Sequence, residues 1–176
     1  MDYYCRCELG RTAALNGIAD WGNFLVAETG AAAALAGLIF VAVSINLTKI
    51  IEYKGVAGRA AEALSLLMGV VLIGTCGLAP GQSLRVLGIE ILAVGLGLWI
   101  MTSVFHLGQL RGRTRPLWWL ASRAFLCHMA TLSFCAAGIL LILGHSAGMY
   151  WLVSGCVFSF LAATTSAWVL LIEIVR

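Results

Sequence analysis

The chain has 176 residues, of which 61% are hydrophobic and 11% charged, and its mean hydropathy is +0.98. Soluble domains carry about a quarter charged residues, so eleven basic and eight acidic side chains are too few for a water-soluble enzyme or nucleic-acid-binding domain of this length. The net charge of +3 is also too small to indicate a nucleic-acid partner. The composition predicts an all-α, polytopic integral membrane protein whose surroundings are the lipid bilayer.

Five stretches are long and apolar enough to cross a bilayer, which takes about 20 residues. A closed β-barrel is excluded because these stretches are continuously apolar and do not alternate. Residues 1–23 are expected to form an N-terminal tail or interfacial segment without the pattern of a cleavable signal, and residues 24–176 a single five-helix domain. The predicted spans are 24–48, 60–79, 84–105, 117–143 and 149–175.

The distribution of basic residues predicts the orientation. Seven lie in the first and third connections and at the C-terminus, against three in the N-terminal tail and the other two connections. Cytoplasmic loops carry the excess of Lys and Arg, so we expect the N-terminus outside and the C-terminus in the cytoplasm. Residues 36–47 resemble segments of small bacterial membrane proteins, which favours the bacterial cytoplasmic (inner) membrane as the location.

Several polar side chains fall inside the predicted spans, where ionisable groups are costly and tend to be functional. Near the inner surface, Glu62, Arg123 and Glu173 are expected to compensate one another's charges, either as a structural salt bridge or as part of a site. Glu28 and Glu90 are expected near the outer surface with no basic residue at matching depth in another span. The intramembrane polar candidates are Glu62, Glu90, Arg123, His128 and Glu173.

The first predicted helix has two unlike faces. Glu28 and Asn46 are eighteen residues, or five turns, apart and therefore share one face. The opposite face is rich in small residues, which let a neighbouring helix approach closely. The first face consists of Glu28, Ala32, Leu35, Ile39, Ala42 and Asn46, and the opposite face of Gly30, Ala33, Ala34, Gly37, Val41 and Ser44.

Two interpretations of the Glu28 face remain open. In one, the helix is an ordinary member of the bundle, with Glu28 at the interface and Asn46 bonded to a neighbour. In the other, symmetric copies surround an axis, with a Glu28 ring at the mouth, a constriction at Leu35 and Ile39, and Asn46 at the exit. Acid rings and apolar constrictions are features of channels, so all six residues of this face are candidates for lining a pore.

No metal site, other cofactor or catalytic constellation is predicted. His106, His128 and His145 are expected at the inner end, the middle and the outer end of the bundle, too far apart to share a metal ion. The chain has no Cys-x-x-Cys pair and no two histidines at i and i+4. Four of the six cysteines lie in apolar stretches, where a thiol is usually a small buried hydrophobe.

Three functional hypotheses follow. The first is a homo-oligomeric channel or pore lined by the first helix. The second is an accessory or regulatory subunit that binds a larger membrane protein and has no permeation path. The third is a membrane enzyme with a site at Glu62, Arg123 and His128, which no recognised constellation supports, so the protein is expected not to be an enzyme.

Overall fold

The computed structural model describes residues 21–45, 56–111 and 117–175, with the side chains of 56–57, 110–111, 117–120 and 169–175 left out. Asn46 and the side chain of Glu173 therefore lie outside the described part. Each of the five helices there is long and apolar enough to cross a membrane, which confirms the predicted all-α, five-span architecture. The helices are α2 (Gly22–Ile45), α4 (Val56–Gly77), α5 (Leu84–Arg111), α6 (Leu117–Ile142) and α7 (Gly148–Val175).

Two helices extend beyond their predicted limits. α5 continues to Arg111 and α4 begins at Val56, so His106 and Arg59 are helical and not in connections. The hydropathy of a sequence shows where an apolar run ends, but a helix continues until its backbone is interrupted, and the first proline after His106 is Pro116. Arg59 is buried in α4, so six basic residues remain on the predicted inner side against three, and the orientation stays a prediction.

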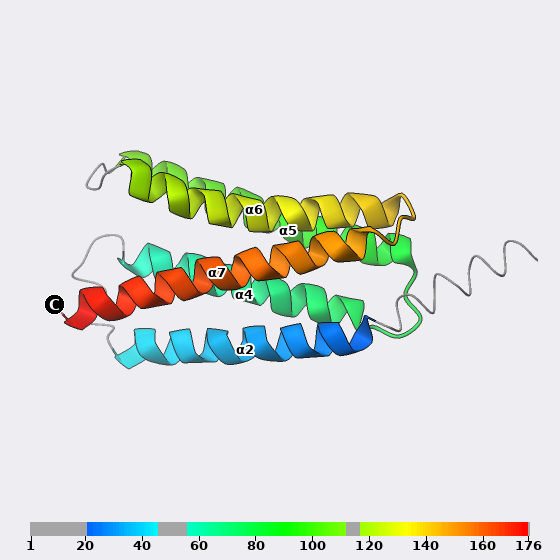
Figure 1. Cartoon of the computed structure of the whole chain (residues 1–176), viewed down its shortest axis with the longest axis horizontal. Coiled ribbons are helices and arrows are strands. Elements are labelled where there is room, and N and C mark those ends of the chain that lie inside the picture. The colour runs from blue at the N-terminus through cyan, green and yellow to red at the C-terminus, as the bar shows by residue number, and fades with distance from the viewer. Residues whose placement is uncertain (1–20, 46–55, 112–116, 176) are drawn as a thin grey trace, which may run out of the picture.

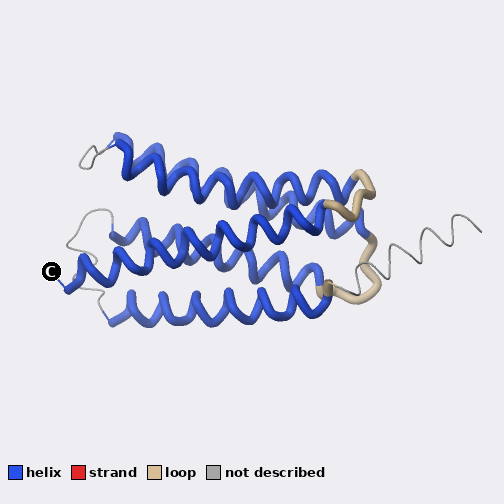
Figure 2. The backbone as a smooth tube through the Cα atoms, viewed as in Figure 1, coloured by secondary structure: helices blue, strands red, loops and turns tan. Residues whose placement is uncertain are grey.

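The helices lie side by side along one long axis (Figure 1). α5 and α6 form one antiparallel pair, α4 and α7 run through the middle, and α2 lies on the far side, packed mainly on α4. The short connections at 78–83 and 143–147 lie at one end of the bundle (Figure 2), and the C-terminus lies at the other. At the end with the two short connections, Trp21, which directly precedes α2, contacts Tyr150 of α7. The two rings are edge-on, with their centroids 5.2 Å apart.

The centre of the core is Phe134 of α6, which is fully buried. Its ring lies against Gly155 of α7, where a Cβ atom would stand 2.4 Å from a ring carbon. The backbone of Gly95 on α5 approaches its Cβ from another side. Small residues at these crossings let the helices close around one large ring, which is how membrane helices gain packing energy where burial from water contributes little.

α5 and α6 cross with their backbones in contact. A Cβ atom at Gly138 would lie 2.8 Å from the backbone nitrogen of Leu92 and 2.9 Å from the carbonyl oxygen of Gly88. We expect Gly138→Leu to lower the free energy of unfolding in detergent by about 3 kcal/mol, because overpacking a close contact moves backbone. Gly97→Leu, with nothing within 4 Å, is the control. Equal stability of the two variants in a surfactant-unfolding titration would contradict this crossing.

The faces of α2 are used in the opposite way to the prediction. Ala32 and Ile39, assigned to a pore, are buried in the core of the same chain, and Leu35 is half-buried against it. At Gly30 and Gly37, which were assigned to tight packing, an added Cβ atom would meet nothing within 4 Å in the described part of the chain. Small residues permit close approach but do not compel it, and here the larger apolar side chains of the Glu28 face pack on α4. In the single chain Ala32 and Ile39 are thus covered by core contacts, and their role as pore-lining residues of an oligomer stays a prediction.

The predicted orientation gives a labelling pattern. A cysteine placed at Gln82, in the connection between α4 and α5, is expected to react with an impermeant thiol reagent in intact cells, whereas one placed at Gly112 is expected to be shielded. The background should lack Cys5 and Cys7 of the native tail. The reverse pattern would invert the assignment of the two ends.

Candidate functional site

The apolar stripes of three helices end in polar side chains at the same end of the bundle. On α4, Glu62 continues a line of buried residues spaced three or four apart, namely Leu66, Val70 and Ile73. On α5, buried Leu98 leads through Thr102 to His106 by the same spacing. Because residues three or four apart share a helix face, these side chains must point into the bundle where their apolar neighbours point.

On α6 the same rule places three further residues at this end. Buried Phe134 leads through Ala130 to Cys127, with His128 beside it and Arg123 one turn earlier. We call Glu62, His106, Arg123, Cys127 and His128 the polar centre. Counted from the ends of the candidate spans at Gly58, Gln109 and Ala121, Glu62, His106 and Cys127 lie about 5 to 9 Å inside along the helix axes.

Glu62 is the hub of the polar centre. Its carboxylate is almost fully buried and accepts a hydrogen bond from Nη2 of Arg123 on its Oε2 atom. Its other oxygen, Oε1, lies 3.2 Å from Nε2 of His106. The sequence-based pairing of Glu62 with Arg123 is confirmed. Removing one partner of such a pair leaves a buried charge uncompensated, which is far more costly than the net value of the pair.

Both histidines fold back on their own helices. Nδ1 of His106 donates to the carbonyl oxygen of Thr102 at 2.8 Å, and Nδ1 of His128 donates to that of Ala124 at 2.9 Å. A carbonyl only accepts, so in each ring Nδ1 carries a proton. Nε2 of His106 faces the Glu62 carboxylate of α4. This arrangement, with one nitrogen anchored and the other exposed to a partner, is common in histidines that bind metals or exchange protons.

The expected separation of His106 and His128 is wrong. Their ring centroids are 5.5 Å apart. Helical side chains lean toward the N-terminus of their own helix. Because α5 and α6 are antiparallel, His106 leans toward the middle of the bundle and His128 leans toward its end, so the two rings meet. The prediction counted the depth of each histidine from the ends of the apolar runs and placed His106 in a connection. It therefore missed that the two rings approach each other.

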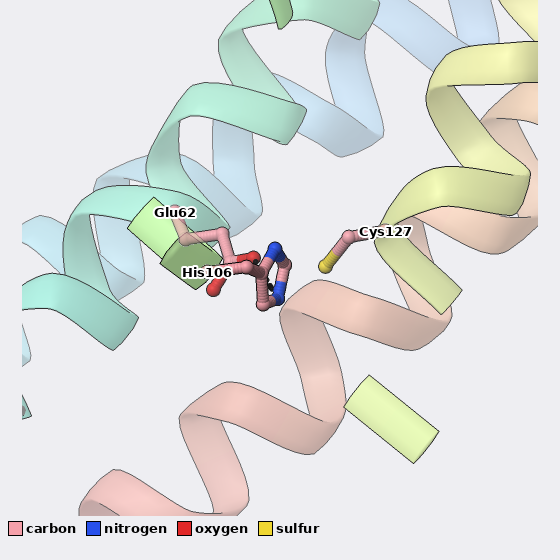
Figure 3. A group of neighbouring side chains, drawn as sticks. All are labelled: Glu62, His106 and Cys127. Carbon is pink, nitrogen blue, oxygen red and sulfur yellow. Dashed lines mark ion pairs between the residues drawn. The ribbon is translucent and has the colours of Figure 1, made fainter. Parts of the chain in front are cut away.

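Cys127 completes a cluster of three metal-binding residue types. One ligand atom each from Glu62, His106 and Cys127 lies within 4.8 Å of the others, and all three residues are buried. In Figure 3 the Cys127 sulfur points toward the His106 ring, which lies beside the Glu62 carboxylate. Sequence analysis assigned no role to His106 or Cys127. The spacing of the apolar residues on α5 and α6 could have indicated both, because it places His106 and Cys127 on the buried faces of their helices.

The other predicted polar residues lie apart from this centre. Glu90 accepts a hydrogen bond from Nε2 of Gln82 at 2.6 Å at the opposite end of the bundle, so it has an amide as a partner. Glu28 of α2 is half-buried, and among the described residues its Oε2 atom has no hydrogen-bond partner. Ala42 is half-buried on α2.

The four described cysteines, Cys76, Cys127, Cys135 and Cys156, are free thiols.

The chain matches no protein-family model, no curated protein and no solved structure. Its class therefore follows from its own fold: an integral membrane protein of five helices. A cluster of ionisable side chains lies inside the candidate spans of three of those helices.

Proposed function

We propose that this protein is a small membrane transport protein that carries a cation through its own helix bundle by way of the polar centre. The observation that carries the proposal is the pair of facing atoms Oε1 of Glu62 and Nε2 of His106, which are buried and 3.2 Å apart. They form an ion pair when the His106 ring is protonated, and with the ring neutral neither atom has a hydrogen-bond partner among the described residues. Buried polar atoms are normally satisfied, so such a pair marks a place where a ligand enters.

The position of the polar centre supports transport. Ionisable residues within membrane spans usually line ion pathways or proton relays, since their burial cost is otherwise unexplained. The centre lies a turn or two from one end of the bundle, close enough to be reached from one surface. Helices α4, α5 and α6 each contribute to it, so small shifts between these helices would open or close the centre.

The α2-lined homo-oligomeric pore has less support. Its proposed constriction at Ile39 is filled by contacts within one chain, and the exposed side of α2 carries small and apolar residues without an acid. An ion path lined by that side would lack the charged ring that a cation pore uses. Transport is therefore assigned to the interior of the bundle.

A second candidate function is an accessory subunit, which the uncovered side of α2 favours. Gly30 and Gly37 lie on that side, where an added Cβ atom would meet none of the described residues within 4 Å. Small residues are typical of surfaces where membrane helices meet. In this case the protein would bind a larger membrane partner through α2, and the polar centre would serve only stability.

Flux measurements in reconstituted vesicles separate these functions. Proteoliposomes loaded with fluorescent indicators for monovalent and divalent cations are expected to show protein-dependent cation entry. Glu62→Gln should lower the rate at least about tenfold, equivalent to about 1.4 kcal/mol on the barrier. Glu90→Gln, an acid at the opposite end, is the matched control and should transport normally.

Glu28→Gln distinguishes the interior path from the α2 pore. A loss of flux in Glu28→Gln but not in Glu62→Gln would favour the α2 pore and contradict the proposal. Absence of cation entry with the folded wild type would leave the accessory function, which co-purification with a larger membrane protein would then support.

A further inference from the structure

We propose that Glu62, His106 and Cys127 form a binding site for a divalent transition-metal ion of the zinc type. This inference rests on the proposed function in one respect, since it names the class of cation carried. The binding site itself can be tested without any transport.

The electronic arrangement of the two buried atoms is the first argument. Nδ1 of His106 holds its proton against the Thr102 carbonyl, so in the neutral ring Nε2 presents a lone pair. That lone pair faces the carboxylate oxygen Oε1 of Glu62 at 3.2 Å, and with the ring neutral neither atom has a hydrogen-bond partner among the described residues. Two electron-rich atoms at this distance repel each other unless a cation lies between them, either a proton on Nε2 or a metal ion.

The spacing of the ligand atoms fits a tetrahedral site. With zinc–nitrogen, zinc–oxygen and zinc–sulfur bonds of about 2.0 to 2.3 Å, tetrahedral angles put nitrogen and oxygen about 3.4 Å apart and sulfur about 3.6 Å from nitrogen. The first separation is 3.2 Å, and the sulfur lies within 4.8 Å of both other atoms. Closing the site takes a movement of the sulfur of at most about 1.2 Å, within reach of a side-chain adjustment on α6.

The donor types select the metal. A thiolate and an imidazole favour zinc and its neighbours in the first transition series, whereas magnesium and calcium prefer oxygen ligands. Three protein ligands leave a fourth position open, as in zinc sites that exchange a ligand. The ring of His128 lies beside these ligands, with its centroid 5.5 Å from that of His106.

The charge balance of a bound dication requires the thiolate of Cys127 as a ligand. Arg123 is bonded to Glu62 and adds positive charge to the polar centre. A dication beside it therefore needs two anionic ligands. The Glu62 carboxylate is one. The Cys127 sulfur becomes the other when its thiol proton is released to solvent as the metal–sulfur bond forms. Arg123 then orients the carboxylate from its second oxygen, as outer hydrogen bonds do in metal sites.

Cobalt(II) titration of the detergent-purified full chain tests the site. Cys5 and Cys7 are first replaced by serine, so that the tail thiols cannot bind the probe. One cobalt ion per chain is expected to bind and to give tetrahedral visible bands with a thiolate charge-transfer band in the near ultraviolet. Zinc should displace the cobalt, and a large excess of magnesium should not.

Matched variants identify the ligands. Cys127→Ser should abolish the charge-transfer band, and His106→Gln should weaken cobalt binding by more than about 100-fold, since even outer-sphere partners contribute 10- to 100-fold. Cys156→Ser and His145→Gln, away from the centre, should leave both unchanged. Cys127→Ser keeps the Glu62–Arg123 pair, so its melting temperature reports whether the bundle stays folded.

The outcomes separate this inference from the transport proposal. A folded wild type that binds no cobalt, or a charge-transfer band that survives Cys127→Ser, would overturn the metal site while leaving transport of another cation untouched. Cobalt bound through Cys127 with no cation flux in vesicles would support the site and contradict transport.

Discussion

Replacing Glu62 with leucine is expected to lower the free energy of unfolding by about 3–5 kcal/mol, because Arg123 would keep its buried guanidinium without a carboxylate. The measurement is surfactant-induced unfolding in mixed micelles, followed by circular dichroism. The effect should be among the largest of any single substitution in the chain, since the cost comes from an uncompensated charge and not from lost packing.

The double variant Glu62→Leu with Arg123→Leu is the control for this prediction. Replacing both members of a buried pair with apolar side chains is often neutral or stabilising, so the double variant should recover most of the loss. If Glu62→Leu alone costs less than about 1 kcal/mol, Arg123 does not depend on Glu62, and the polar centre as described is wrong.

Phe134→Ala is the second substitution with a large expected effect. Phe134 is fully buried and its ring fills the space left by Gly95 and Gly155. In water-soluble proteins this change costs 3–5 kcal/mol. In a membrane the unfolded helices remain in apolar surroundings, so part of the transfer energy is absent while the cavity remains. We therefore expect a loss of about 3 kcal/mol in the same unfolding measurement.

Phe125→Ala on the same helix provides the comparison. Its side chain is 58% exposed to the surroundings of the chain, where lipid replaces what the substitution removes. A loss of less than about 0.5 kcal/mol is expected, as for most surface positions. Similar losses in the two variants would mean that α6 does not present Phe134 to α5 and α7.

The helices themselves could be predicted because bilayer thickness fixes the length of an apolar run. The predicted and observed limits agree closely for α6 and α7. The misplaced ends, at Arg59 and His106, both occur where a helix continues into polar sequence. Hydropathy is insensitive to such extensions, since it responds to side chains and not to backbone hydrogen bonds.

The site could be predicted only in part. Charge at matching depth indicated the pairing of Glu62 with Arg123, which the structure confirms. The approach of His106 to His128 depends on the antiparallel packing of α5 and α6 and on the direction in which each side chain leans. Neither can be deduced from the depth of each residue within its predicted span. The packing face of α2 was predicted to be the small-residue face, whereas the Glu28 face packs in the chain, because both faces are compatible with contact in an apolar solvent.

Cation selectivity of a Cys127→Asp variant tests the central claim most directly. A carboxylate in place of the sulfur should shift preference from softer to harder ions, so the ratio of zinc to manganese flux in proteoliposomes should fall at least about tenfold relative to wild type, while manganese still enters. Cys76→Asp, at the opposite end of α4, should leave the ratio unchanged. A ratio unaltered by Cys127→Asp in a folded, transporting protein would contradict passage of the cation through the site formed by Glu62, His106 and Cys127.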